Sequence, residues 1–251
     1  MNENLAKEAA TFTETTFIED LETIVKISDT LFLTVPDDLI TTVWNQMKDM
    51  SLEGKFICHC SGALSAGDAF PGIDKCGAFG YSVHPLFAVS DKYNSYKELS
   101  HAYFVIEGDE KHREEIAGIF NNLGNEVRYI AAKDKVKYHC AAAVCSNHVV
   151  ALIQESLDLM QECGFDEESA LKALAPIMLG NMQHIAEHGT VNSLTGPVER
   201  ADVKTVEKHL NCLDEKQQML YRLLSEVLIS IGEKKNPGRD YGRLKHILGN
   251  E

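Results

Sequence analysis

Several features that would place a protein in a class at once are missing from this sequence. None of its seven cysteines forms a Cys-x-x-Cys pair, and no second cluster of ligands has suitable spacing, so zinc is not expected. No run approaches the ~20 uninterrupted apolar residues that a membrane-spanning helix needs. The first residues carry neither the basic start nor the apolar core of a secretory signal. These absences predict a cytoplasmic protein with no metal ion and no membrane partner.

Positive charge is also scarce. The chain has 24 Lys and Arg residues against 38 Asp and Glu, which gives a formal net charge of −14. Proteins that bind nucleic acid present a basic face to the phosphate backbone, and here the basic residues are dispersed among more numerous acids. A nucleic-acid partner is therefore not expected. At 251 residues with 44% hydrophobic content, the chain can form one or two ordinary globular domains.

Hydrophobic patterning changes character near residue 131. Before it, helical patterns alternate with five strand patterns, at residues 30–35, 55–60, 76–83, 102–106 and 126–130. This alternation is typical of a largely parallel sheet with right-handed crossovers. After it, residues 134–163, 166–188, 202–210 and 214–234 all have helical patterns. We predict an α/β domain over residues 1–131 and an all-helical domain over residues 132–251.

Three polar side chains interrupt the small, apolar helix predicted from residue 134. At about 100° per residue, His139 and Ser146 fall nearly in line and Asn147 lies about 80° away. All three can therefore face one cavity. Two interpretations stay open: satisfied polar residues within a core, or a functional site.

Loops after the predicted strands form a second candidate region, because ligands of doubly wound sheets bind beyond the carboxyl ends of the strands. Two of these loops could offer backbone amides to an anionic or ribose group, although capped turns look the same. A histidine ending the third strand would emerge at the same rim, unless it is only a surface residue. The candidates are Thr34, Val35, Pro36, Asp37, Ser61, Gly62 and His84.

A turn-rich loop in the helical half could bind a carboxylate. It offers the Thr195 hydroxyl, the amides after Gly196 and the bidentate guanidinium of Arg200, and it leads into a helix that Asp202 can cap. The alternative is a capped turn with a surface Arg–Asp pair, which would contribute little.

Taken in order, these motifs resemble a known family, the Rossmann-like oxidoreductases that carry the domain of unknown function 2520. The resemblance covers residues 5–232, and the family is in turn similar to pyrroline-5-carboxylate reductase, 3-hydroxyisobutyrate dehydrogenase and the 6-phosphogluconate dehydrogenases. The matching motifs are Val35-Pro-Asp-Asp38, His59-Cys-Ser-Gly62, His84-Pro-Leu86, Tyr138-His139, Ser146-Asn147 and Leu194-Thr-Gly-Pro197 with Arg200 and Asp202.

The resemblance implies a nicotinamide-binding domain followed by a helical domain of the 6-phosphogluconate dehydrogenase type, through which two chains form a homodimer. NADP or NAD would bind at the loops of residues 34–37 and 61–62. Lys137, His139, Ser146 and Asn147 would line the substrate side of the nicotinamide pocket. His139 would act as acid and base, since the histidine pKa lies near working pH. His84, Thr195, Gly196 and Arg200 would bind a small polar substrate.

The sequence departs from the family at its front end. It contains no Gly-x-Gly-x-x-Gly turn, and Met1 falls just after the point where the family's second strand should end. The first strand, the glycine-rich turn, its helix and the acidic ribose-binding position are therefore expected to be absent, which makes the Rossmann-like sheet incomplete. A smaller departure is Ala201, where the family often has glycine.

Two functions therefore stay open. One is an NAD(P)-dependent oxidoreductase, or the greater part of one, acting on a small, carboxylate-bearing substrate. The other is a non-catalytic metabolite-binding or regulatory dimer that has lost the cofactor. A hydrolase using His59, His84 or His139 with Cys140 ranks last, because no acidic or thiol partner stands at a recognisable spacing.

Overall fold

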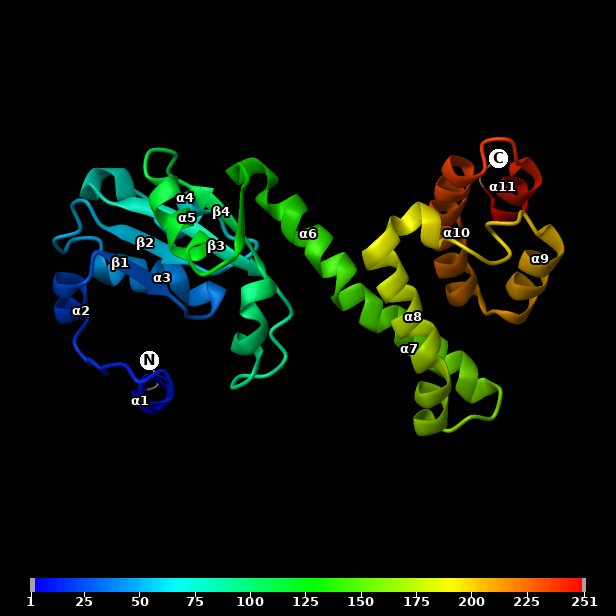
Figure 1. Cartoon of the computed structure of the whole chain (residues 1–251), viewed down its shortest axis with the longest axis horizontal. Helices are drawn as coiled ribbons and strands as arrows, with labels where there is room; N and C mark the ends of the chain where they lie inside the picture. The colour runs from blue at the N-terminus through cyan, green and yellow to red at the C-terminus, as the bar shows by residue number, and fades with distance from the viewer. Residues whose placement is uncertain (1–2, 250–251) are drawn as a thin grey trace. The chain divides into compact units, whose positions relative to one another are not determined.

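The computed structural model describes residues 3–249 and divides the chain into two compact units, up to Ile153 and from Gln154 onward. Figure 1 shows the sheet of the first unit and the helices of the second. The predicted domain boundary at residue 131 lies earlier, because the secondary-structure pattern changes there. The first helix beyond that point still belongs to the first compact unit.

A five-stranded sheet forms the centre of the first unit. Its strands lie in the order of the chain: β1 (Thr30–Leu33), β2 (Phe56–His59), β3 (Phe79–Leu86), β4 (Tyr103–Gly108) and β5 (Glu126–Tyr129). All neighbouring pairs are parallel except β3 with β4, which confirms the prediction of a largely parallel α/β sheet. Leu33 pairs with His59, and His59 pairs with Ser82. The chain segments that follow these positions therefore meet at one rim of the sheet.

Helices cover the sheet and bury two apolar clusters. The α-helices of this part are α1 (Glu3–Phe12), α2 (Leu21–Ile27), α3 (Asp37–Met47), α4 (Ala66–Ala69) and α5 (Arg113–Asn121), and the 3-10 helices are η1 (Ile73–Cys76), η2 (Ser95–His101) and η3 (Ala132–Asp134). One cluster centres on Trp44 of α3, whose indole nitrogen donates to the Pro71 carbonyl at 3.1 Å. Tyr81 and Ile116 belong to the other cluster, which includes residues of α5. Together the clusters fix β1, β2 and β3 as a rigid base for the rim.

The free edge of β1 borders a hollow of about 780 Å³. Side chains of α1, α2, β1 and α3 line it, and most of them are apolar. Helix α1 buries none of its own residues, so it does not fill this space. Thr34 and Val35, two of the residues predicted to bind cofactor, also line the hollow.

Glycine is required where β4 ends. Gly108 has φ +145°, and a Cβ there would lie 2.1 Å from the Gly80 carbonyl oxygen. We expect Gly108→Ala to lower the free energy of unfolding by about 3 kcal/mol, because backbone rather than a flexible side chain must move. Gly124→Ala is the control: it also has positive φ but nothing lies within 4 Å, so about 1 kcal/mol should be lost. Urea titrations that show equal losses would contradict this prediction.

The rest of the chain is helical, with α6 (Lys135–Cys145), α7 (Asn147–Glu162), α8 (Glu167–Ser193), α9 (Val203–Cys212), α10 (Glu215–Lys235) and α11 (Gly242–Leu248). The helix predicted over residues 134–163 is present with one local distortion at Ser146 (φ −113°, ψ −71°), where α6 ends and α7 begins. Gly189 likewise interrupts α8. The core of the second unit lies among α9, α10 and α11, around Val206, Ile229 and Leu244.

Helices α6, α7 and α8 bury very little. Their buried residues are Lys135, Leu157, Ala170 and Ser193. Within residues 3–249, the stretch Ala132–Glu162 is the one helical segment long and apolar enough to cross a membrane, and its most apolar window is only 6% buried. A helix in water normally gains its stability by packing an apolar face. Much apolar helix surface is therefore left uncovered by a single chain.

Candidate active site at the carboxyl ends of β1, β2 and β3

Two of the predicted strand-end loops are joined by a hydrogen bond. Asp37 begins α3 just after β1, and Ser61 follows β2. The Ser61 hydroxyl donates to the Asp37 carboxylate at 2.5 Å and accepts the backbone N–H groups of Ala63 (3.3 Å) and Leu64 (3.0 Å). The hydroxyl therefore ties the start of α3 to the turn after β2, and it holds Gly62 at a fixed place on the rim.

Gly62 lies directly beneath two imidazole rings. A Cβ at this position would lie 2.5 Å from Cδ2 of His139 and 2.8 Å from Nε2 of His84. The centroids of the two rings are 6.2 Å apart. Glycine is therefore the residue that lets a strand histidine and a helix histidine approach the same stretch of backbone. The structure brings together three residues that the sequence placed in separate motifs.

His84 lies within β3 rather than at its end, because the strand continues to Leu86 alongside β4. Its Nδ1 is hydrogen-bonded to the Tyr138 hydroxyl at 2.7 Å. Burial, and then the positive charge of Lys135, lowers the pKa of His84 to about 4. Burial raises the pKa of Tyr138 to about 12. At neutral pH this is accordingly a hydrogen bond between two uncharged groups.

A buried polar chain runs below these rings. Lys135, only 1% exposed, donates through Nζ to the Ser82 hydroxyl at 2.5 Å. Ser82, fully buried, donates in turn to the Ser61 carbonyl at 3.0 Å. Burial lowers the pKa of Lys135 to about 8, although the carboxylates of Glu107 and Asp37 oppose the shift. The lysine is therefore mostly protonated at pH 7 and carries its charge into the interior.

Two further titratable groups are buried at the same place. His59, fully buried, accepts the Ser61 N–H at its Nδ1 (3.1 Å), so its proton sits on Nε2, which has no hydrogen-bond partner within the described residues. Burial, and then Lys135, lowers the pKa of His59 to about 4. Glu107 of β4 accepts the Ala66 N–H at 2.8 Å, and burial raises its pKa. The rim thus combines uncharged histidines with one buried cation and one buried acid.

Comparison with known proteins decides the family. Residues 102–228, just over half of the chain, match the family model described as "Domain of unknown function (DUF2520)". The chain belongs to the DUF2520 family. No curated protein is similar enough in sequence to match it.

Solved structures with the same fold extend over nearly the whole DUF2520 chain. Protein TM1727 of Thermotoga maritima is 27% identical, with a TM-score of 0.77 over 94% of this chain and 89% of that one. A candidate NADP oxidoreductase of Bacteroides fragilis is 18% identical (TM-score 0.68, 92% and 86% covered). A Plasmodium falciparum pyrroline carboxylate reductase with NADP bound is 14% identical (TM-score 0.54, 87% and 82% covered). These likenesses confirm a Rossmann-like α/β domain followed by a helical domain.

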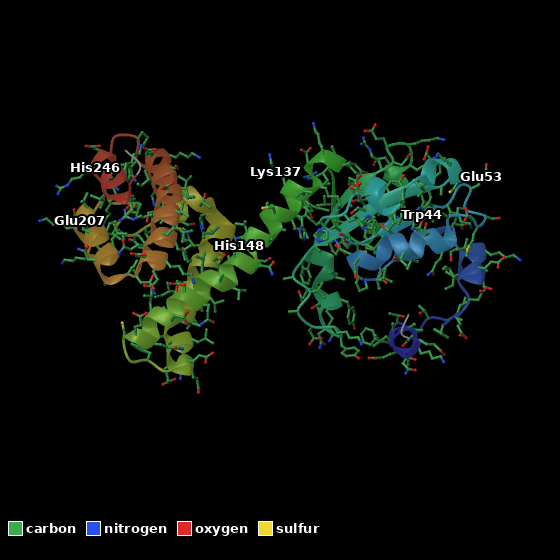
Figure 2. All side chains as sticks on the ribbon, turned by 180° about the vertical axis from the view of Figure 1, so that it is seen from behind. Trp44, Glu53, Lys137, His148, Glu207 and His246 are labelled. Carbon is green, nitrogen blue, oxygen red and sulfur yellow. The ribbon has the colours of Figure 1, made fainter. Side chains whose placement is uncertain are left out.

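Some of the predicted DUF2520 site residues do not join this cluster. Ser146 and Asn147 lie at the break between α6 and α7, where the Ser146 hydroxyl bonds the Ala142 carbonyl at 3.0 Å and the Asn147 side chain at 3.2 Å. Lys137 is exposed on α6, where Figure 2 labels it.

The predicted carboxylate loop belongs to the second unit. Thr195 and Arg200 are exposed there, and Asp202 caps α9 by accepting the Thr205 N–H at 3.2 Å. Gly196 has φ +97°. Ala201 has φ +54°, in the left-handed region that favours glycine, which gives a physical reason for glycine at this position in the family. The loop is thus a well-capped turn that exposes the side chain of Arg200.

Sequence reasoning missed three residues of the rim, which are Lys135, Ser82 and Glu107, and it named His59 only within a motif and as a candidate of the hydrolase alternative. A lysine at the first position of a helix is normally solvated, and nothing local in the sequence marks Lys135 as buried. Glu107 did carry a signal, since it stands in an otherwise apolar strand with buried neighbours. An acid in such a run needs a partner, and the Ala66 amide supplies it.

Proposed function

We propose that this DUF2520 protein is an NAD(P)-dependent oxidoreductase that acts on a small polar substrate bearing a carboxylate. The observation that carries the proposal is the meeting of His84 and His139 over Gly62, at the carboxyl ends of parallel strands. Ligands of open α/β sheets bind at this rim. Two solved neighbours, a candidate NADP oxidoreductase and a pyrroline carboxylate reductase with NADP bound, support the same reaction class.

The residues of this rim fit the nicotinamide half of the cofactor. Thr34 and Val35 line the hollow beside β1, and Gly62 presents bare backbone next to two rings. The amides at the start of α3 would meet a ribose or an anionic group, as helix N-termini do. When bound, the nicotinamide would supply or accept the hydride. Pro36, Asp37 and Ser61 would hold the loop that contacts it.

His139 is the proposed acid and base. It is exposed, so its imidazole can exchange a proton with solvent and with a substrate oxygen or nitrogen. His84 is held uncharged by its surroundings and would orient the substrate by a hydrogen bond without changing charge. Asn147, Ser146 and Lys137 would contact the polar groups of the substrate. In the second unit, Thr195, Gly196 and Arg200 would form a site for a carboxylate, which a guanidinium binds by two parallel hydrogen bonds.

Titration with NADPH and NADH, followed by nicotinamide fluorescence, tests the proposal. We expect saturable binding by the wild-type chain. Gly62→Ala should weaken it by about tenfold or more, because the added methyl must displace both rings at the rim. Gly67→Ala is the matched control: its nearest neighbour would be the Ser65 hydroxyl at 3.9 Å, an ordinary contact. A folded chain that binds neither cofactor would overturn the proposal and favour the metabolite-binding or regulatory alternative.

We also propose that the protein is a homodimer through its helices. The chain exposes 16168 Å². A protein of 27.9 kDa should expose about 13,000 Å² even if each unit is treated as a separate domain. The excess of about 3,000 Å² exceeds what one partner of an ordinary interface buries, and it suits an obligate interface.

The apolar residues behind this excess follow helix faces in the second unit. Met219, Leu223 and Val227 are 65%, 56% and 59% exposed and stand four residues apart on α10. On α8, which packs against α10, Ile177 and Leu179 are 68% and 71% exposed. The α10 residues lie along one helix face, and such an apolar row suits a second copy of the same helices. Ile177 and Leu179, two residues apart, are exposed on opposite sides of α8. We name these five residues the α8–α10 face.

A further inference from the structure

Helix α8 carries two exposed histidines one turn apart. The rings of His184 and His188 are stacked, with their centroids 4.3 Å apart and their planes at 22°. Residues four apart on a helix are neighbours on its surface, so the helix itself keeps the two rings together. Two histidines at this spacing can bind one metal ion, because both imidazoles reach it from the same side of the helix.

The Nδ1 atom of each ring is hydrogen-bonded to a protein oxygen. His184 Nδ1 lies 2.8 Å from the Ser193 hydroxyl, and that hydroxyl donates its one proton to the Gly189 carbonyl at 2.7 Å. His184 must therefore donate to Ser193. His188 Nδ1 lies 3.3 Å from the His184 carbonyl, which can only accept, so His188 donates as well. In its uncharged form each ring thus has its proton on Nδ1, which leaves the lone pair on Nε2 for another partner.

The interruption of α8 brings Ser193 within reach of His184. Nine residues of continuous helix would separate the two side chains by roughly 13 Å along the axis. Gly189 leaves helical geometry instead, with φ 77° and ψ 169°, and the Ser193 hydroxyl contacts the His184 ring. Ser193 is only 8% exposed. A buried hydroxyl therefore fixes the orientation of an exposed ring.

This pattern is the one that metal-bound histidines show. Such a ligand donates its other ring N–H to a protein oxygen, which fixes both the tautomer and the direction of the ring. Glu187 adds negative charge: one of its carboxylate oxygens lies 3.9 Å from His188 Nδ1, and the other accepts the Gln183 amide at 2.9 Å. Among residues 3–249 no third His, Cys, Asp or Glu completes the group. Water would therefore fill the remaining positions around an ion held here.

We propose that His184 and His188 form a two-histidine clamp for a divalent transition-metal ion, which both Nε2 atoms bind. Uncharged imidazole suits Ni²⁺, Cu²⁺ and Zn²⁺, whereas Mg²⁺ and Ca²⁺ prefer oxygen ligands. Metal–nitrogen bonds of about 2.1 Å require the stacked rings to tilt toward each other, and their exposure leaves room for this. The expectation of no metal ion was based on cysteine spacing, and the histidine pair replaces it. The clamp is independent of cofactor and substrate.

Calorimetric titration of the full chain with NiCl₂ tests the clamp. The wild type should bind one Ni²⁺ per chain, and His184→Gln and His188→Gln should each weaken binding by about 100-fold, because one ligand alone loses the advantage of two linked ones. The double variant should bind little more weakly than either single variant. His246→Gln is the matched control: it removes one exposed imidazole from α11 of the same unit, where Figure 2 labels it, and should leave the affinity unchanged. The exposed cysteines are common to all these variants, so the differences report the imidazoles alone.

Ser193→Ala tests the anchor of the His184 ring. It keeps both imidazoles and removes only the oxygen to which His184 Nδ1 donates, so Ni²⁺ binding should weaken by about tenfold, less than on loss of a ligand. An affinity equal to that of the wild type would show that the hydroxyl does not orient the ring and would contradict the proposed geometry.

The protein without metal offers a measurement that needs no variant. Long-range proton–nitrogen NMR spectra at pH 8 report the tautomer of each histidine ring, and both His184 and His188 should carry the proton on Nδ1. The proposal would be overturned by a proton on Nε2 of either ring, by Ni²⁺ affinities that are equal in the wild type and in folded His184→Gln, or by an equal loss in His246→Gln. Each of these results would mean an adventitious ion only.

Discussion

Acidification from pH 7 to pH 4.5 should lower the free energy of unfolding of the first unit by about 2 to 4 kcal/mol. The expected cause is the protonation of His59 and His84, which are held uncharged in the folded chain. Their pKa values are lowered to about 4, whereas an unfolded histidine titrates near 6.5. This is one of the two largest effects that the structure predicts.

The direction follows from proton counting. Between pH 6.5 and pH 4 the unfolded chain binds a proton at each of these histidines and the folded chain does not, so stability rises with pH across this window. The contribution is fully present above about 6.5 and is lost as pH falls toward 4. His59 is fully buried and should supply about 2 kcal/mol; His84 is half-buried, so solvent screening reduces its share.

Trp44 makes the measurement selective. It is the sole tryptophan of the chain, it is fully buried, and it lies in the first unit, so its fluorescence reports the unfolding of that unit alone. Urea titrations at pH 7, 6, 5 and 4.5 would give the change of the free energy of unfolding with pH for the wild type and for His59→Asn. The asparagine oxygen can replace Nδ1 as acceptor for Ser61, but it cannot be protonated in this range.

His59→Asn should be less stable than the wild type at pH 7, because the smaller side chain leaves space in the core. It should nevertheless lose less stability than the wild type on acidification. His101→Gln, an exposed position, should keep the wild-type slope. If His59→Asn and the wild type fell in parallel, the acid sensitivity would have to come from carboxylates, and the assignment of uncharged histidines would be wrong.

The sequence predicts those residues of the rim whose positions depend only on where the strands end. Ser61 and Gly62 follow an apolar strand, and parallel pairing brings such positions to one edge of the sheet, where His84 lies within β3. The contact of His139 with Gly62 required the path of α6, which no local pattern fixes. Lys135 could not be found, because its burial depends on the distant hydroxyl of Ser82 rather than on its sequence neighbours.

The helical half was predictable in kind but not in detail. Residues 134–163 have a helical pattern throughout, and the chain is helical there with a local distortion at Ser146. The Ser146 hydroxyl bonds the Ala142 carbonyl, a competition with backbone bonding that serine offers at many positions. Arg200 and Thr195 lie in a unit of their own, so a sequence that places them in one motif says nothing of what faces them. The exposure of apolar residues on α8 and α10 could not be predicted from hydrophobic periodicity either. An apolar row has the same sequence pattern whether it packs in the core of its own chain or against a partner.

Charge placed on the α8–α10 face should separate the proposed homodimer into single chains. We expect the wild type at micromolar concentration to have twice the mass of one 27.9 kDa chain, and the double variant Leu179→Glu with Leu223→Glu to have the mass of one. A carboxylate buried without a partner in an apolar interface is costly, so association should weaken by about 100-fold or more. Light scattering coupled to size exclusion measures both masses directly.

Both substituted residues are largely exposed in the single chain, so the double variant should fold as well as the wild type. Lys204→Glu on α9 is the matched control: it is exposed, it changes charge in the same direction, and it lies outside the α8–α10 face. Equal thermal midpoints of the far-ultraviolet signal at high dilution would show that the variants differ in assembly and not in folding.

Two results would contradict the dimer. A wild-type mass of one chain at micromolar concentration would leave the excess apolar surface without a second copy to cover it. Sedimentation of the wild type with neutral phosphatidylcholine vesicles would instead assign the apolar stretch Ala132–Glu162 to a membrane. The sequence of this stretch favours a dimer over a membrane, because the polar residues Ser146 and Asn147 interrupt it near its middle. In a bilayer those groups would have to find partners within the protein, whereas in a dimer they can stay in water.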